Sequence, residues 1–170
     1  MTSSQAHEHK LDAPQSIGCT VITCSDTRTP ETDASGQLIQ KMLEGNGHRI
    51  ASYYIVKDDP GQITHRIMLG TFNKAVQVII VNGGTGISRR DSTFEAVNSI
   101  LQKRLDGFGE IFRYLTYQEI GSPAIMSRAA AGIINGRIVF SIPGSENAVR
   151  LAMEKLILPE LGHLIKELTK

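Results

Sequence analysis

The stretch AVQVIIVNGGTGISRRD, residues 75–91, carries the strongest indication of fold class in the chain. Its first half is apolar and rich in valine and isoleucine, which predicts a strand at residues 75–81 that is buried on both faces. Its second half has three glycines within four residues, followed by two arginines and an aspartate. A buried strand that ends in a glycine-rich loop is typical of α/β proteins, which bind ligands at the carboxyl ends of their strands.

Strand-like and helix-like segments alternate around this stretch. Apolar runs predict further strands at residues 17–23 and Arg49–Val56. Helical spacing of apolar residues and N-cap residues predict helices at residues 33–44, from Pro60 onward, and after a capping box at residues 92–95. This order predicts a single three-layer α/β domain in which a mostly parallel sheet has helices on both faces.

The C-terminal third is less regular. Residues 123–131 are expected to be helical. Residues 133–142 are expected to form a β-hairpin with Asn135 and Gly136 as its two-residue turn. Ser145 should cap a final helix to about residue 158, with a further segment from Pro159 to residue 168. Residues 1–15 are polar and without hydrophobic period, so we expect a flexible tail before a domain at residues 16–170.

Composition excludes several classes of protein. The chain has 170 residues, of which 41% are apolar, and a net charge of +1 from 18 basic and 17 acidic side chains. Such a balance argues against nucleic-acid binding, and no apolar run has the roughly 20 residues needed to span a membrane. Cys19 and Cys24 should lie on opposite faces of one strand as reduced core residues. We expect a cytoplasmic protein.

Four predicted strand ends carry small or polar residues, at residues 23–26, 56–59, 81–91 and 142–145. Because the carboxyl ends of parallel strands lie at one edge of a sheet, these segments should converge on one crevice. Gly83, Gly84 and Gly86 would let backbone N–H groups approach phosphate or carboxylate oxygens. A tight structural turn is an equally open interpretation. The loop is not a Walker A motif, because no Gly-Lys-Ser/Thr follows, and it is not a dinucleotide fingerprint, since Arg89 stands where a third glycine is required.

A carboxylate beside an anion-binding loop indicates a cation. Asp91, with Asp58 or Asp59, would suit Mg²⁺, which prefers a few carboxylates together with phosphate oxygens. The alternative is that Asp91 only favours a helix start and Asp59 only caps one. Arg90 would either bind a phosphate or be solvated. No nucleophile elbow is present, which favours phosphoryl or nucleotidyl transfer by positioning and metal over covalent catalysis.

Five motifs occur in order: Ser25-Asp26-Thr27, Asp33-x-Ser35-Gly36, GGTG at residues 83–86 with Arg90-Asp91-x-Thr93, Met126-Ser127-Arg128-Ala129, and Pro143-Gly144-Ser145. Together they resemble the MoaB/MogA family of molybdenum cofactor biosynthesis proteins, over residues 17–168. The resemblance implies a molybdopterin-binding fold that forms trimers or hexamers. It also implies Mg²⁺-ATP-dependent adenylylation of molybdopterin, with release of pyrophosphate and transfer of the product to a molybdate-inserting enzyme.

The resemblance also assigns residues. Asp58 and Asp91 match the catalytic or metal-associated aspartates of the family. The remaining matches are substrate-binding positions: Ser25, Asp26, Gly83, Gly84, Thr85, Gly86, Arg90, Thr93, Ser127, Pro143, Gly144 and Ser145. Three alternatives stay open at this point: a catalytically silent MoaB-type molybdopterin-binding protein, an oligomeric scaffold, and a nicotinamide oxidoreductase.

Overall fold

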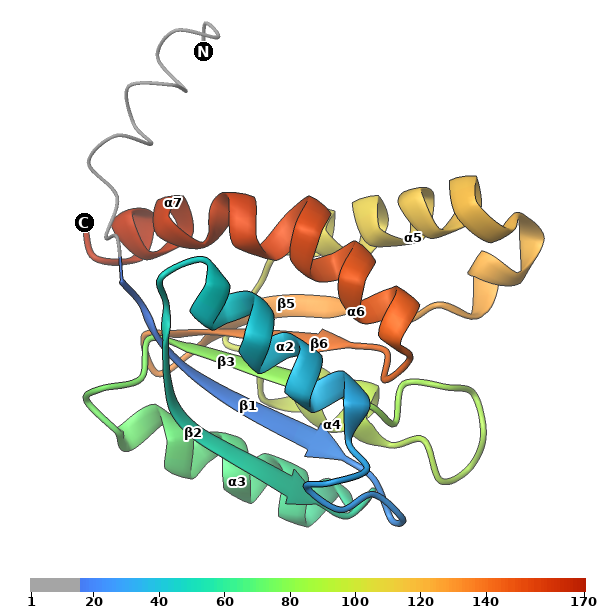
Figure 1. The fold of residues 1–170 in the computed structure, drawn as a ribbon, viewed down its shortest axis with the longest axis horizontal. Helices are drawn as coiled ribbons and strands as arrows, with labels where there is room; N and C mark the ends of the chain where they lie inside the picture. Colours follow the sequence, from blue (N-terminus) through green and yellow to red (C-terminus); the bar gives the residue numbers. More distant parts are fainter. Residues whose placement is uncertain (1–15) are drawn as a thin grey trace, which may run out of the picture.

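A six-stranded sheet forms the centre of the computed structural model, which describes residues 16–170 (Figure 1). The expected N-terminal tail at residues 1–15 lies outside the described residues. The strands are β1 (Gly18–Cys24), β2 (Arg49–Val56), β3 (Val78–Asn82), β4 (Lys103–Arg104), β5 (Ala130–Ile134) and β6 (Arg137–Ile142). Their order is β2-β1-β3-β6-β5-β4, and β5 alone runs antiparallel to its neighbours. The predicted mostly parallel sheet is confirmed.

Helices cover both faces of this sheet (Figure 1). They are α2 (Ala34–Gly45), α3 (Pro60–Phe72), α4 (Thr93–Ile100), α5 (Asp106–Ile120), the 3₁₀ helix η1 (Ser122–Met126), α6 (Glu146–Ala152), the π-helical turn η2 (Met153–Ile157) and α7 (Leu158–Leu168). One core cluster joins the sheet to α2, α5, α6 and α7, and a second joins it to α3 and α4. Within residues 16–170, no helix is long and apolar enough to cross a membrane.

Several local predictions are confirmed. Cys19 and Cys24 lie in different core clusters, and burial raises the pKa of both thiols to about 12, so they are reduced core residues. The carboxylate of Asp59 accepts a hydrogen bond from the N–H of Gln62 at 2.8 Å and so caps α3. Asn135 and Gly136 have φ angles of 48° and 69°, the left-handed pair that a tight β5–β6 hairpin turn requires.

Other predictions are wrong. Residues 123–131 are not one helix, because η1 ends at Met126 and β5 begins at Ala130, where pairing with β6 overrides the helix propensity of alanine. The capping box at residues 92–95 is absent. The hydroxyl of Ser92 makes no cap hydrogen bond and contacts the carbonyl of Asp58 at 3.4 Å, while Glu95 pairs with Arg128.

The N-cap of α2 is a carboxylate that is wholly buried: Asp33 is 0% exposed. Five groups donate hydrogen bonds to its two oxygens at 2.5–3.2 Å, namely Thr23 Oγ1, Tyr53 OH, Arg28 Nη1, Ser35 Oγ and the N–H of Gly36. Burial alone would raise the pKa of the Asp33 carboxyl, but these hydrogen bonds outweigh it and hold the pKa below its ordinary value. The carboxylate therefore stays ionised inside the protein.

The contacts of Asp33 extend to the ends of three strands. The side-chain amide of Asn82, the last residue of β3, donates to Thr23 Oγ1 at 2.8 Å, and Asn82 Oδ1 lies 3.1 Å from Ser35 Oγ. Arg28, paired with Asp33, donates through Nη2 to the carbonyl of Gly144 at 3.0 Å. A single buried charge thus joins the ends of β1 and β3 to the loop that follows β6.

Replacing Asp33 by asparagine should destabilise the fold by about 3–5 kcal/mol, because Arg28 loses its ionic partner and an amide N–H₂ replaces an acceptor. Tyr53→Phe, which removes one donor and leaves the charge, should cost only about 1 kcal/mol. Urea unfolding at neutral pH measures both. Since the pKa of folded Asp33 is depressed, its stabilisation is present at neutral pH and is lost as the pH falls through that depressed pKa, so the Asp33→Asn difference should shrink in acid. Equal losses in the two variants would contradict this account.

Candidate functional site

Loops from three parallel strands line one cavity of about 500 Å³. They are the segments after β1, β3 and β6, and residues 126 and 127 close the opposite side. The end of β2 joins them through a hydrogen bond of 2.8 Å from the N–H of Ser25 to the carbonyl of Val56. The predicted convergence of strand ends is therefore present in the structure.

The loop after β3 contains backbone N–H groups that donate no hydrogen bond to any described residue. Gly83 and Gly84 have φ angles of 104° and 56°. The N–H of Gly83 donates to Ile142 at 3.1 Å, and the carbonyl of Gly84 accepts from the N–H of Thr93 at 3.0 Å. Within residues 16–170, the N–H groups of residues 84–87 donate no hydrogen bond. Four successive free donors that begin at the second of two left-handed glycines are suited to binding an anion.

Glycine is required at two of these positions by contact as well as by φ. A Cβ on Gly83 would collide with the carbonyl oxygen of Cys24. A Cβ on Gly84 would collide with a carboxylate oxygen of Asp58 and with the hydroxyl of Thr93. These collisions show how closely the loop approaches the ends of β1 and β2. They also place a carboxylate oxygen of Asp58 next to the Cβ position of Gly84.

Asp58 is a carboxylate in an unfavourable place. Burial raises its pKa above the ordinary value, and the negative charges of Asp26 and Asp91 raise it further. The hydrogen bond from Thr93 Oγ1, at 3.4 Å, offsets this only in part. Asp91 lines the cavity and accepts hydrogen bonds from the hydroxyl and the N–H of Ser88 at 2.5 and 3.1 Å. The arrangement is short of positive charge.

Ten of the residues expected from the sequence line the cavity: Ser25, Gly83, Gly84, Thr85, Gly86, Asp91, Ser127, Pro143, Gly144 and Ser145. Four do not. Asp58 and Thr93 lie behind Gly84, where both would collide with a Cβ at that position. The carboxylate of Asp26 accepts a hydrogen bond from the N–H of Asp58 at 3.3 Å. The side chain of Arg90 is 88% exposed and approaches only Asp26, at 4.0 Å. Its expected role in substrate binding stays a prediction.

The sequence analysis missed other lining residues: Cys24, Thr27, Arg28 and Met126. Arg28 is the one cationic residue among those that line the cavity. Its position two residues after the Ser25-Asp26 pair was a usable signal. Ser127 and Arg128 were expected on a helix, whereas they lie in the extended link between η1 and β5.

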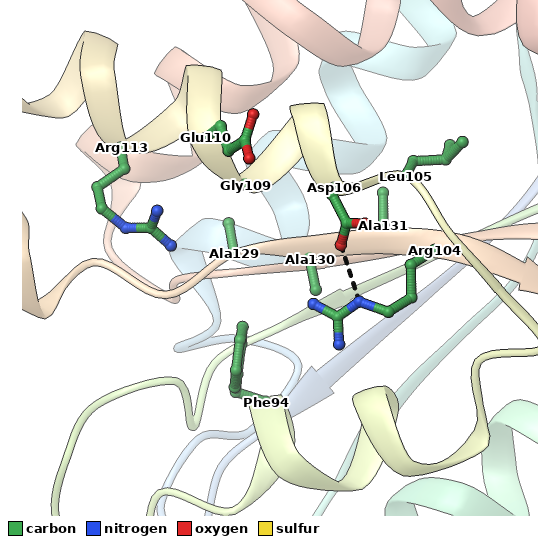
Figure 2. Close-up of a pocket in the computed structure, with 10 residues that line it drawn as sticks. All are labelled: Phe94, Arg104, Leu105, Asp106, Gly109, Glu110, Arg113, Ala129, Ala130 and Ala131. Carbon is green, nitrogen blue, oxygen red and sulfur yellow. Dashed lines mark hydrogen bonds and ion pairs between the residues drawn. The ribbon is translucent and has the colours of Figure 1, made fainter.

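A second hollow, of about 230 Å³, lies between α4, α5 and β5 (Figure 2). Phe94 of α4 points toward Ala129, and Arg104 pairs with Asp106 at 2.9 Å on one side (Figure 2). None of the residues expected to bind substrate lines it. Along the chain it is linked to the main cavity by Arg128, since Ser127 lines the cavity and Ala129 lines the hollow.

Comparison with known proteins agrees with this geometry. Residues 20–163 match the model of a family described as a probable molybdopterin binding domain. The chain is 53% identical to molybdenum cofactor biosynthesis protein B of Bacillus cereus over 162 residues, which is 95% of this chain and 96% of the relative. It is also 53% identical to the protein of the same name in Bacillus subtilis, over 96% of each chain.

Solved structures show the same fold. A crystal structure of molybdenum cofactor biosynthesis protein B superimposes with a TM-score of 0.90 at 53% identity, covering 93% of this chain and 99% of the other. The tungsten cofactor synthesizing protein MoaB from Pyrococcus furiosus superimposes with a TM-score of 0.83 at 36% identity, covering 93% and 100%. The chain therefore belongs to the molybdopterin-binding family of molybdenum cofactor biosynthesis proteins that includes MoaB.

Proposed function

We propose that this protein transfers an adenylyl group from Mg²⁺-ATP to molybdopterin and releases pyrophosphate. The observation that carries the proposal is the run of N–H groups at residues 84–87 that donate no hydrogen bond: Gly84, Thr85, Gly86 and Asp91 line the cavity, and the carboxylate of Asp58 lies behind Gly84. Family membership supports a pterin ligand. Anion donors next to excess carboxylates are the combination that a phosphate substrate with its cation would use.

The reaction joins two phosphates without a covalent enzyme intermediate. An oxygen of the terminal phosphate of molybdopterin attacks the α-phosphorus of ATP and forms a new P–O bond. The bond from the α-phosphorus to the oxygen that bridges to the β-phosphorus breaks, and pyrophosphate leaves with that electron pair. A phosphate nucleophile is already ionised, so no side chain has to remove a proton. The work of the protein is to position groups and offset charge.

The residues of the cavity divide this work. The N–H groups of the glycine loop would hold phosphate oxygens. Arg28 would offset negative charge from the β1 side of the cavity. Ser25 and Ser145 are already used locally: the hydroxyl of Ser25 accepts hydrogen bonds from the N–H groups of Thr27 and Arg28, and the hydroxyl of Ser145 caps α6 by accepting one from the N–H of Ala148. They therefore shape the loops after β1 and β6 that enclose the substrates.

The carboxylates fit Mg²⁺ as a partner of the substrate phosphates. Within residues 16–170, no three acidic, histidine or cysteine side chains are grouped as a complete metal site. Mg²⁺ does not need such a group, because it is commonly held by one or two carboxylates and by phosphate oxygens. Burial, followed by the negative charges of Asp26 and Asp91, raises the pKa of Asp58, which supports an external cation as its partner. When bound there, Mg²⁺ would neutralise charge on the departing pyrophosphate.

A second candidate is a molybdopterin-binding protein that does not turn over. The relatives of about 50% identity fit either candidate, since their shared name states a pathway and no reaction. Both candidates use the same pocket, and only the first requires the carboxylates. Assembly into trimers or hexamers, transfer of product to a molybdate-inserting enzyme and a cytoplasmic location stay predictions.

Asp58→Asn should make the protein more stable at neutral pH, by roughly 0.5–1 kcal/mol. The folded-state pKa of Asp58 is raised, so the ionised form opposes folding above that pKa and costs nothing at a pH below the unfolded-state value. Thermal unfolding should therefore show a higher midpoint for Asp58→Asn at pH 7 and equal midpoints near pH 3. A lower midpoint at pH 7 would mean that Asp58 is a structural carboxylate.

Product formation tests the function itself. The purified protein is mixed with molybdopterin and Mg²⁺-ATP, and adenylyl-molybdopterin and pyrophosphate are quantified. Asp58→Asn and Asp91→Asn should each lower the rate about a hundredfold or more. Asp59→Asn is the matched control, because Asp59 caps α3 and asparagine caps equally well, so its rate should stay within about twofold of the wild type. If no product forms while molybdopterin binds tightly, the second candidate is correct.

A further inference from the structure

Arg128 lies outside the cavity and donates two hydrogen bonds to the glycine loop. Its Nε donates to the carbonyl of Thr85 at 2.8 Å, and its Nη2 donates to the carbonyl of Gly86. Its Nη1 pairs with the carboxylate of Glu95 on α4. The guanidinium lies 4.8 Å from the ring centroid of Phe94, and the side chain is 22% exposed. Four contacts thus fix one cation in orientation.

The effect of these contacts passes through the peptide plane. In a trans peptide the carbonyl of one residue and the N–H of the next point in opposite directions. When Arg128 holds the carbonyls of Thr85 and Gly86, the N–H groups of Gly86 and Ile87 are turned to the opposite side. Thr85 and Gly86 line the cavity and Arg128 does not, so for these two residues the side away from Arg128 is the cavity side; Ile87, the next residue, lies at its edge and does not line it.

The rest of this loop is held only at its ends. Hydrogen bonds fix Gly83 and Gly84 at the start and join Asp91 to Ser88 near the finish. Among the described residues, Arg128 is the only hydrogen-bond partner of the backbone of residues 85–87. Without it, the two peptides could rotate and present carbonyl oxygens, which repel an anion.

We propose that Arg128 is a positioning residue for a phosphate-binding site: it holds two carbonyls of the glycine loop outward and so presents the N–H groups of Gly86 and Ile87 to a phosphate oxyanion. This inference rests on the proposed function, which puts phosphate at that loop. The oxyanion has two sources, the phosphates of ATP and the terminal phosphate of molybdopterin. Glu95 and Phe94 position the guanidinium itself.

The test compares Arg128→Gln with Arg113→Gln, which removes the same charge from the exposed surface of α5. Dissociation constants are measured by calorimetry for Mg²⁺-ATP and, separately, for molybdopterin. Arg128→Gln should raise the dissociation constant of one or both ligands roughly tenfold, because two oriented hydrogen bonds are lost. Arg113→Gln should leave both constants within about twofold of the wild type. The ligand that weakens identifies which phosphate the loop holds.

Chemical rescue distinguishes a positioning role of Arg128 from a purely structural one. Millimolar guanidinium added to Arg128→Ala should restore affinity and leave the thermal midpoint unchanged. If neither Arg128 variant folds, Glu95→Gln decides, since it keeps the guanidinium and removes its orienting partner, and it should also weaken binding. Variants that bind both ligands like the wild type would overturn the role of Arg128 and leave the proposed function standing. A wild-type protein that binds neither ligand would overturn both.

Discussion

The buried carboxylate of Asp33 is the interaction on which the rest of the site depends. It lies at the start of α2 and is wholly excluded from solvent, yet its pKa is held below the ordinary value. Its partners belong to β1, β2 and α2, and Arg28 extends the set to the loop after β6. Arg28 and Gly144 both line the cavity, so the buried charge of Asp33 helps to fix the loops after β1 and β6 that form two of its walls.

Asp33 and Asp58, two carboxylates near the cavity, have surroundings that shift their pKa values in opposite directions. The pKa of Asp33 is lowered by donors that surround it, whereas the pKa of Asp58 is raised by burial and by neighbouring acids. In a structural carboxylate, the protein itself supplies the hydrogen-bond donors and positive charge that stabilise the ionised form. Asp58 is not satisfied by the protein alone, and such a group is a candidate for binding an external cation. The same pattern distinguishes Asp59, which caps α3, from Asp58 next to it.

Much of the fold could be predicted from the sequence because its signals are local. Alternating apolar runs located the parallel strands, and Asn135-Gly136 located the hairpin turn. The helix α5 was not predicted from the sequence. Large aromatic residues such as Tyr114 and Tyr117 are about 60% exposed, so its apolar residues do not follow the one-sided spacing by which an amphipathic helix is recognised. The helix expected at residues 123–131 failed because strand pairing with β6 is a tertiary effect that alanine-rich sequence does not reveal.

The candidate site, like the fold, was predicted from the sequence only in part. Glycines and polar residues at strand ends were visible, and parallel topology brought them together. The residues that hold the loops were not visible as such, because their contacts span long separations. Arg28 meets Gly144 across 116 positions, and Arg128 meets Thr85 across 43. Asp33 appeared in a motif, but only the fold shows that it is buried and surrounded by donors.

A crystal structure of the protein with Mg²⁺ and a non-hydrolysable ATP analogue tests the central claim most directly. The account predicts phosphate oxygens within hydrogen-bond distance of N–H groups in residues 84–87, with the cation between those oxygens and the carboxylates of Asp58 and Asp91. Binding of the nucleotide in the hollow beside Phe94 and Ala129, with the glycine loop unoccupied, would contradict it.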